Sequence, residues 1–155
     1  MNSGSTIKIL LADDDKDDCI FFKEVLDEMD QTTSFKAVND GEQLMYYLND
    51  EKNELPSVLF LDINMPRKNG AACLKEIKRN ENLKQIPVII FSTSYDENIA
   101  GVLYKNGAHY YIRKPGEFSE LKNIIGQALT LISKGDKQQP SREKFLLSRL
   151  KPILY

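Results

Sequence analysis

The chain has 155 residues, enough for one domain with a single hydrophobic core. Its net charge of −2 gives no general attraction for nucleic acid, so we expect no nucleic-acid partner. A bilayer span needs about 20 apolar residues, and neither such a run nor a signal peptide is evident, which predicts a cytoplasmic protein with no membrane partner.

Short apolar segments alternate with segments of helical periodicity over most of the chain. Strands are predicted at residues 7–12, 34–39, 57–61, 87–91 and 109–113, and helices at 17–29, 40–48, 71–79, 97–105 and 118–132. Alternation of this kind is typical of a parallel sheet with helices on both faces. We therefore predict an α/β protein with a (βα)5 flavodoxin-like doubly wound parallel sheet of strand order 2-1-3-4-5.

Four of the five predicted strands end on polar residues that can do chemistry. The first runs into Asp13, Asp14 and Asp15, the third into Asp62, the fourth into Ser92 and Thr93, and the fifth into Lys114. In the order 2-1-3-4-5 these four strands are adjacent, and the carboxyl ends of parallel strands share the edge where ligands bind. The sequence therefore predicts one site at this edge.

The residue types in this site favour a metal ion and a phosphoryl group. Asp13, Asp14 and Asp62 are the predicted metal ligands, because Mg²⁺ prefers oxygen ligands. Lys114 supplies the opposing charge and Ser92 a hydroxyl. This set indicates phosphoryl transfer, and Asp62 is the predicted nucleophile because a carboxylate can form an acyl phosphate.

Taken singly, these residues have plainer interpretations. An Asp at the end of a strand is more often a turn or cap residue. Asp17 and Asp18 are interpreted as first-turn acids that complement a helix dipole and have no role in the site. It is the coincidence of four strand ends that favours a functional site.

These segments together resemble the receiver domain of two-component response regulators, over about residues 6–133. ILLADDD resembles the acidic pocket of that family, and FLDINMPRKNG resembles its phosphoacceptor loop. VIIFSTS resembles the fourth strand with the switch hydroxyl, and YYIRKP resembles the fifth strand with the switch aromatic residue and the lysine.

The resemblance implies a role for each matching residue. Asp62 would be the phosphoacceptor, and Mg²⁺ would be held by Asp13, Asp14, Asp62 and the carbonyl of Asn64. Ser92, Thr93 and Lys114 would bind the phosphoryl group, and Ser92 and Tyr111 would act as the switch. The donor would be a phosphohistidine of a sensor histidine kinase or a histidine phosphotransfer protein, and the output a contact with a downstream protein. Such a protein is not an enzyme beyond its own phosphorylation and dephosphorylation.

Three alternatives fit less well. A haloacid-dehalogenase-like phosphatase needs a second acid two residues after the nucleophile, where this chain has Asn64. A flavin-binding protein needs a first loop that cradles phosphate, and ADDDKDD would repel it. A pseudo-receiver that only binds partners would not need the intact acids and Lys114.

The composition changes after residue 133. Residues 134–155 are interpreted as a polar linker followed by a short amphipathic helix from Arg142 to Leu150. This segment is too short for a DNA-binding output domain, so the chain looks like stand-alone receivers, including those that pair with phytochrome-type kinases and dimerise. We expect the apolar side of the helix to pack on the receiver or on a second copy in a homodimer.

Overall fold

The computed structural model describes residues 6–134 and 138–148. Its elements are β1 (Ile7–Ala12), α1 (Lys16–Asp27), β2 (Thr33–Val38), α2 (Gly41–Asn49), β3 (Val58–Leu61), α3 (Gly70–Arg79), β4 (Val88–Ser92), α4 (Glu97–Lys105), β5 (Tyr110–Arg113), α5 (Phe118–Ser133), a short 3-10 helix η1 (Arg142–Lys144) and β6 (Leu146–Leu147). The strands form one parallel sheet in the order β2-β1-β3-β4-β5-β6. The predicted (βα)5 sheet and its order 2-1-3-4-5 are confirmed, and β6 adds a strand that we had not predicted.

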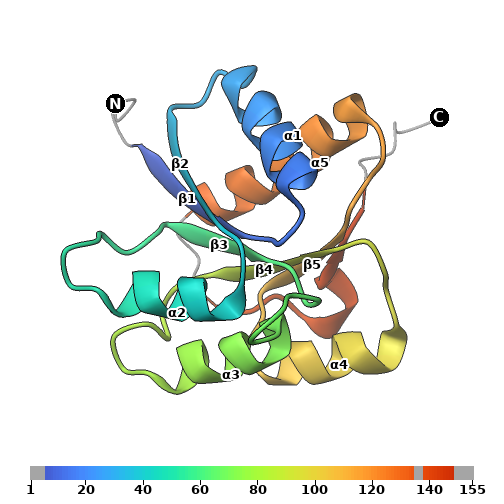
Figure 1. Ribbon diagram of the computed structural model, residues 1–155. Coiled ribbons are helices and arrows are strands. Elements are labelled where there is room, and N and C mark those ends of the chain that lie inside the picture. Colours follow the sequence, from blue (N-terminus) through green and yellow to red (C-terminus); the bar gives the residue numbers. More distant parts are fainter. Residues whose placement is uncertain (1–5, 135–137, 149–155) are drawn as a thin grey trace.

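Helices cover both faces of the sheet. α1 and α5 lie on one face, and α2, α3 and α4 lie on the other (Figure 1). Each face has its own apolar core, because successive residues of a strand point to opposite sides. On the α1–α5 side, the ring of Phe22 lies 4.9 Å from that of Phe60 and 5.5 Å from that of Phe91, between ring centroids. Among the described helices, none is long and apolar enough to cross a bilayer.

Polar residues after the strands also start the helices. The side chain of Asp15 accepts hydrogen bonds from the backbone N–H groups of Asp17 and Asp18 at the start of α1. Asp40 caps α2 and Asn69 caps α3 in the same way. Such caps satisfy N–H groups that have no partner inside the helix. Asp15, the third acid after β1, is therefore a helix cap.

The tail does not form the helix that we predicted. The prediction of a helix from Arg142 to Leu150 is wrong over residues 142–148, because η1 is followed there by an extended segment. Residues 149 and 150 lie outside the described residues. Burial alternates here, with Phe145 and Leu147 buried and Leu146 exposed, which is the period of a strand. β6 completes the open edge of β5, and the N–H of Tyr111 donates to the carbonyl of Phe145 at 2.9 Å.

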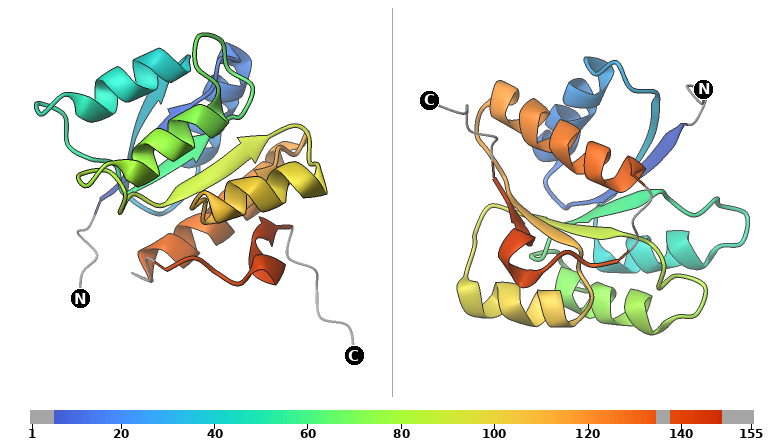
Figure 2. Two further views of the ribbon diagram at one scale, coloured as in Figure 1. Left: turned by 90° about the horizontal axis from the view of Figure 1, so that it is seen from below. Right: turned by 180° about the vertical axis from the view of Figure 1, so that it is seen from behind.

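The tail packs on the same chain, beside β5 and α4 (Figure 2). The hydroxyl of Tyr104 donates to the carbonyl of Pro140 at 2.6 Å, and Gln139 Nε2 donates to the carbonyl of Ala108 at 2.7 Å. The ring of Phe145 is fully buried, with its centroid 5.3 Å from that of Tyr104 and 6.1 Å from that of Tyr111. The described tail, residues 138–148, therefore covers the β5 edge.

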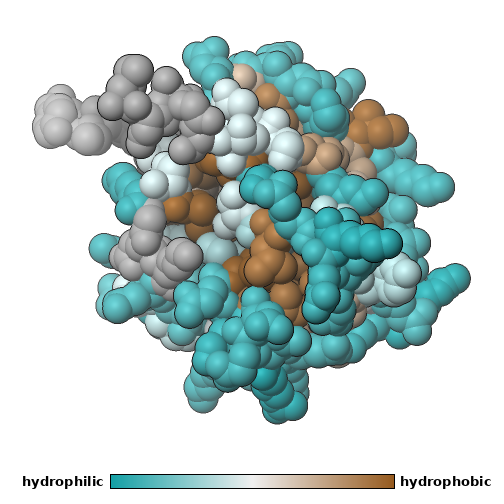
Figure 3. Space-filling model, turned by 90° about the vertical axis from the view of Figure 1, so that its left-hand side faces the viewer, coloured by the Kyte–Doolittle hydropathy of each residue, from teal (hydrophilic) through white to brown (hydrophobic). Residues whose placement is uncertain are grey.

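The two ends of the sheet differ in character. Figure 3 shows the end at which the strands begin, where hydrophilic side chains surround a smaller area of apolar ones. The polar residues that the sequence singled out lie at or just after the last residue of each strand, so they lie at the opposite, carboxyl end. That end carries the candidate site.

Candidate functional site at the carboxyl edge of the sheet

Three carboxylates meet where β1 and β3 end. Asp13, Asp14 and Asp62 each place an oxygen within 4.8 Å of the others. Asp13 and Asp62 are buried and Asp14 is exposed, so the cluster is partly accessible to solvent. The prediction that these acids converge is confirmed by this geometry.

Backbone pairing fixes the two buried acids. The N–H of Asp62 donates to the carbonyl of Ala12 at 2.9 Å, which carries the β1–β3 pairing one residue beyond β3. Each carboxylate also accepts a backbone hydrogen bond from two residues further on: Asp13 Oδ1 from Asp15 at 3.0 Å, and Asp62 Oδ1 from Asn64 at 3.3 Å. These local turns leave the Oδ2 atoms free to face the lysine.

Lys114 enters the cluster from the end of β5. Its backbone N–H donates to the carbonyl of Ser92 at 2.8 Å, which ties the strand end to β4. Its Nζ lies 2.7 Å from Asp13 Oδ2 and 3.8 Å from Asp62 Oδ2. The ammonium also donates a hydrogen bond to Asp18 Oδ2 at 2.8 Å. One cation therefore serves three carboxylates.

The interpretation of Asp18 as a first-turn acid without a role in the site is wrong. Asp18 does lie in the first turn of α1, but its carboxylate reaches across to Lys114, 96 residues away along the chain. Helical spacing does not indicate this contact, because Asp14 precedes the cap residue Asp15 and the partner Lys114 is brought close only by the tertiary fold.

Burial and crowding shift the acid–base equilibria of the site. Burial raises the pKa of Asp62 to about 6, with the charge of Lys114 opposing the rise and that of Asp13 adding to it. Burial raises the pKa of Asp13 as well. Burial lowers the pKa of Lys114, but its hydrogen bonds to Asp13 and Asp18 outweigh this and leave the pKa above its usual value. Without a metal ion, the site thus holds two acids that ionise less readily than an exposed aspartate, beside a lysine that stays charged.

The other predicted site residues surround this cluster. Ser92 is fully buried at the end of β4, and its Oγ accepts a long hydrogen bond of 3.5 Å from the N–H of Ser94. Thr93 and Asn64 are exposed on the loops that follow β4 and β3. Tyr111 lies with its ring buried, and its hydroxyl donates to the carbonyl of Ser94. The loop after Ser92 therefore connects the site to Tyr111.

The loop after Asp62 is tightly packed against α3. A Cβ added to Gly70 would lie 2.1 Å from the carbonyl oxygen of Asp62, so no larger residue fits there without moving the acid. The N–H of Gly70 also donates to the carbonyl of Ile63 at 2.8 Å. Arg67, between them, has a φ of 66°, a conformation that is uncommon for a residue with a side chain. This loop thus positions Asp62 through backbone contacts.

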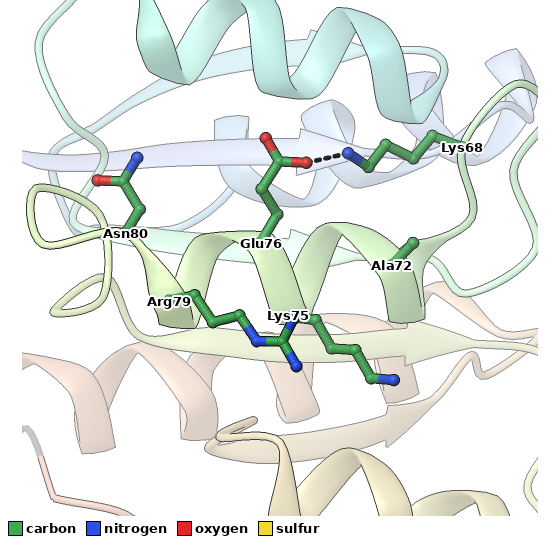
Figure 4. A pocket seen from close by; sticks show the side chains of 6 residues that line it. All are labelled: Lys68, Ala72, Lys75, Glu76, Arg79 and Asn80. Carbon is green, nitrogen blue, oxygen red and sulfur yellow. Dashed lines mark hydrogen bonds and ion pairs between the residues drawn. The ribbon is translucent and has the colours of Figure 1, made fainter.

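A second hollow lies on α3, away from the acids. It is lined by Lys68, Ala72, Lys75, Glu76, Arg79 and Asn80. Lys68 pairs with Glu76 toward α2, while Lys75 and Arg79 extend along the other side of the helix (Figure 4). Because α3 and its cap supply all but one of these residues, the hollow is a shallow helix surface and does not resemble a pocket that encloses a ligand.

A doubly wound parallel sheet with an acidic cluster and a lysine at its carboxyl edge defines a receiver-type α/β protein. The chain belongs to the response regulator receiver domain family, whose sequence profile matches residues 9–126. It is similar to the response regulator Rcp1 of Synechocystis sp., with 31% identity over 121 residues, which cover 76% of this chain and 82% of that protein.

Solved structures give the same relationship. The Mn²⁺-bound form of Rcp1 has a TM-score of 0.75 and 28% identity, covering 87% of this chain and 99% of that one. The phosphorylated cyanobacterial phytochrome response regulator RcpA has a TM-score of 0.77 and 30% identity, covering 88% of this chain and 100% of that one. Receiver domains are signalling modules that bind a divalent metal in an acidic pocket and interact with histidine kinases and downstream partners.

Proposed function

We propose that this chain accepts a phosphoryl group on Asp62 from a phosphohistidine of a sensor histidine kinase or a histidine phosphotransfer protein. The observation that carries the proposal is the convergence of Asp62 with Asp13, Asp14 and Lys114 at one sheet edge. A carboxylate in this setting has a cation on one side and oxygen ligands for a metal on the other. That combination suits phosphoryl transfer, in which positioning and charge neutralisation do most of the work.

The transfer exchanges one bond to phosphorus for another. A carboxylate oxygen of Asp62 forms a bond to phosphorus as the bond to the donor's histidine nitrogen breaks. The imidazole leaves with the electron pair and takes up a proton, and Asp62 becomes an acyl phosphate. Asp62 must be ionised to attack, and its pKa of about 6, although raised by burial, still lies below neutral pH.

The acidic cluster fits a divalent cation of the Mg²⁺ type. Asp13, Asp14 and Asp62 offer oxygen atoms only, and Asn64, two residues after Asp62, would add its carbonyl. Such a cation, when bound, neutralises the carboxylates and the phosphoryl oxygens. The similar protein Rcp1 has been seen with Mn²⁺ bound, which supports a divalent metal here.

The phosphoryl group would be sensed by the residues at the ends of β4 and β5. Ser92 would donate a hydrogen bond from its hydroxyl and Lys114 from its ammonium, and Thr93, the next residue after Ser92, would also contact the phosphoryl group. Ser92 and Tyr111 would form the switch, because the loop from Ser92 to Ser94 links the buried hydroxyl to the Tyr111 hydroxyl. A change at Asp62 would then alter the surface offered to a downstream protein or to a second copy of the chain.

Labelling with a small phosphoryl donor tests the proposal. The full chain is incubated with acetyl phosphate and Mg²⁺, and the intact mass is measured before and after treatment with base. We expect the wild type to gain one base-labile phosphoryl group, and Asp62→Asn to gain none.

Asp15→Asn is the matched control, because Asp15 is an acid of the same loop that caps α1 and Asn is an equally good cap. It should label like the wild type. A wild type that never labels would favour the pseudo-receiver alternative, and equal labelling of Asp62→Asn would show that another residue is the acceptor.

A further inference from the structure

Lys114 lies closer to Asp13 and Asp18 than to Asp62, the proposed acceptor. Its Nζ is 2.7 Å from Asp13 Oδ2 and 2.8 Å from Asp18 Oδ2, but 3.8 Å from Asp62 Oδ2. A distance of 3.8 Å is too long for a hydrogen bond. A phosphoryl oxygen on Asp62 would compete with these two nearer carboxylates for the ammonium of Lys114.

The two near partners differ in how easily they can be left. Asp13 is completely buried and belongs to the proposed metal cluster, so a bound metal ion would remain as its partner when Lys114 moves. The side chain of Asp18 is 32% exposed, and water can solvate it when Lys114 departs. The hydrogen bond from Lys114 to Asp18 is therefore the contact whose loss the metal does not compensate, so this contact opposes movement of the ammonium.

We propose that Asp18 is a positioning residue that holds Lys114 in its resting place and opposes its movement toward the phosphorylated acceptor. This inference rests on the proposed function of Asp62. Asp18 acts through Lys114 and has no contact of its own with the proposed acceptor in the described structure. Breaking the Lys114–Asp18 ion pair costs free energy, and this cost reduces the net gain from the attraction between Lys114 and the phosphoryl group. Asp18 therefore shifts the equilibrium between the resting and the phosphorylated arrangement toward the resting one.

Binding of a phosphoryl analogue measures this balance directly. Beryllium fluoride is titrated into the full chain with saturating Mg²⁺, and its apparent Kd is followed by NMR or calorimetry. We expect Asp18→Asn to bind the analogue about fivefold more tightly than the wild type, as for the loss of one partly exposed ion pair. Asp18→Glu keeps the charge and should stay closer to the wild type than Asp18→Asn.

Asp17→Asn is the matched control for charge and for the helix terminus. Asp17 is also a first-turn acid of α1 whose N–H donates to Asp15, but it forms no ion pair with Lys114 in the described structure. Its affinity for the analogue should stay within about twofold of the wild type. An equal gain in Asp17→Asn would mean that net charge, not the Lys114 contact, is responsible, and would overturn the proposal.

A second readout needs neither metal nor analogue. In EDTA, urea unfolding should show Asp18→Asn to be less stable than Asp17→Asn, because only the former loses a hydrogen bond to Lys114. If the wild type fails to bind beryllium fluoride at all, the proposed function of Asp62 is wrong. If the wild type binds it and Asp18→Asn binds it equally or more weakly, the proposed function stands and the role of Asp18 is rejected.

Discussion

Two edges of one sheet are stabilised in opposite ways in this chain. At the carboxyl edge, Asp13, Asp62 and Lys114 are charged groups held in a largely buried place. At the β5 edge, the tail contributes Phe145, whose ring is fully buried against Tyr104 and Tyr111. Burial of a ring stabilises the fold, whereas burial of like charges opposes it. The buried charges at the first edge therefore cost stability, and the buried ring at the second edge supplies it.

The two edges meet on a single strand. β5 carries Tyr111, which contacts the tail, and it ends just before Lys114, which contacts the acids. The hydroxyl of Tyr111 reaches the loop that follows Ser92. A change at either edge can therefore reach the other through β5. The contribution of each edge to the free energy of unfolding can be measured by replacing one side chain.

Replacement of Phe145 by Ala should give the largest effect. Replacement of a fully buried Phe by Ala costs about 3 kcal/mol or more of folding stability, and here it also removes the ring that packs β6 against the receiver. Urea unfolding should show this loss, and hydrogen exchange at Tyr111, whose N–H donates to Phe145, should speed up.

Leu146→Ala is the control for this change, because Leu146 is its neighbour in the tail but is 39% exposed. It should cost less than about 1 kcal/mol. A chain that ends at residue 134 should lose about as much stability as Phe145→Ala. If the truncated chain is as stable as the wild type, the tail does not stabilise the receiver.

The sequence predicts the first edge well and the second poorly, for a physical reason. Asp13, Asp62 and Lys114 each follow a strand that is recognisable by its apolar run, so parallel pairing alone brings them together. The tail strand spans only Leu146–Leu147, too short to show a period, and its apolar residues also fit a helix. Its place depends on the unpaired edge of β5, a tertiary feature. Asp18 was missed because its contact with Lys114 is tertiary as well.

Replacement of Asp62 by Asn should stabilise the metal-free protein, with a pH dependence that follows from the pKa of the acid. Burial raises the pKa of Asp62 from 3.8 to about 6. The folded state therefore binds this proton more tightly than the unfolded state, so folding stability falls as pH rises from about 4 to about 6 and then levels off. The amide introduced by Asp62→Asn carries no such charge, and Lys114 retains Asp13 and Asp18 as partners.

Urea unfolding in EDTA should therefore show Asp62→Asn more stable than the wild type by at most about 3 kcal/mol at about pH 7.5, and by about half of that at about pH 5. Asp14→Asn is the control, because Asp14 belongs to the same cluster but is exposed, and its effect should be smaller. A gain for Asp62→Asn that is the same at both pH values would show that repacking, not the buried charge, is responsible.

Replacement of Arg142 by Gln tests a solvent-exposed ion pair between the tail and the receiver. Arg142 pairs with Glu97 of α4 at 2.7 Å and lies 5.5 Å from the centroid of the Phe145 ring. The pair is open to solvent, so its loss should cost only about 0.5 kcal/mol, and less in high salt. Glu97→Gln should cost the same, and the double variant no more than either single one if the ion pair carries the effect. If Arg142→Gln costs much more than Glu97→Gln, Arg142 acts mainly by covering Phe145, and the tail is held by its apolar contacts even at the surface.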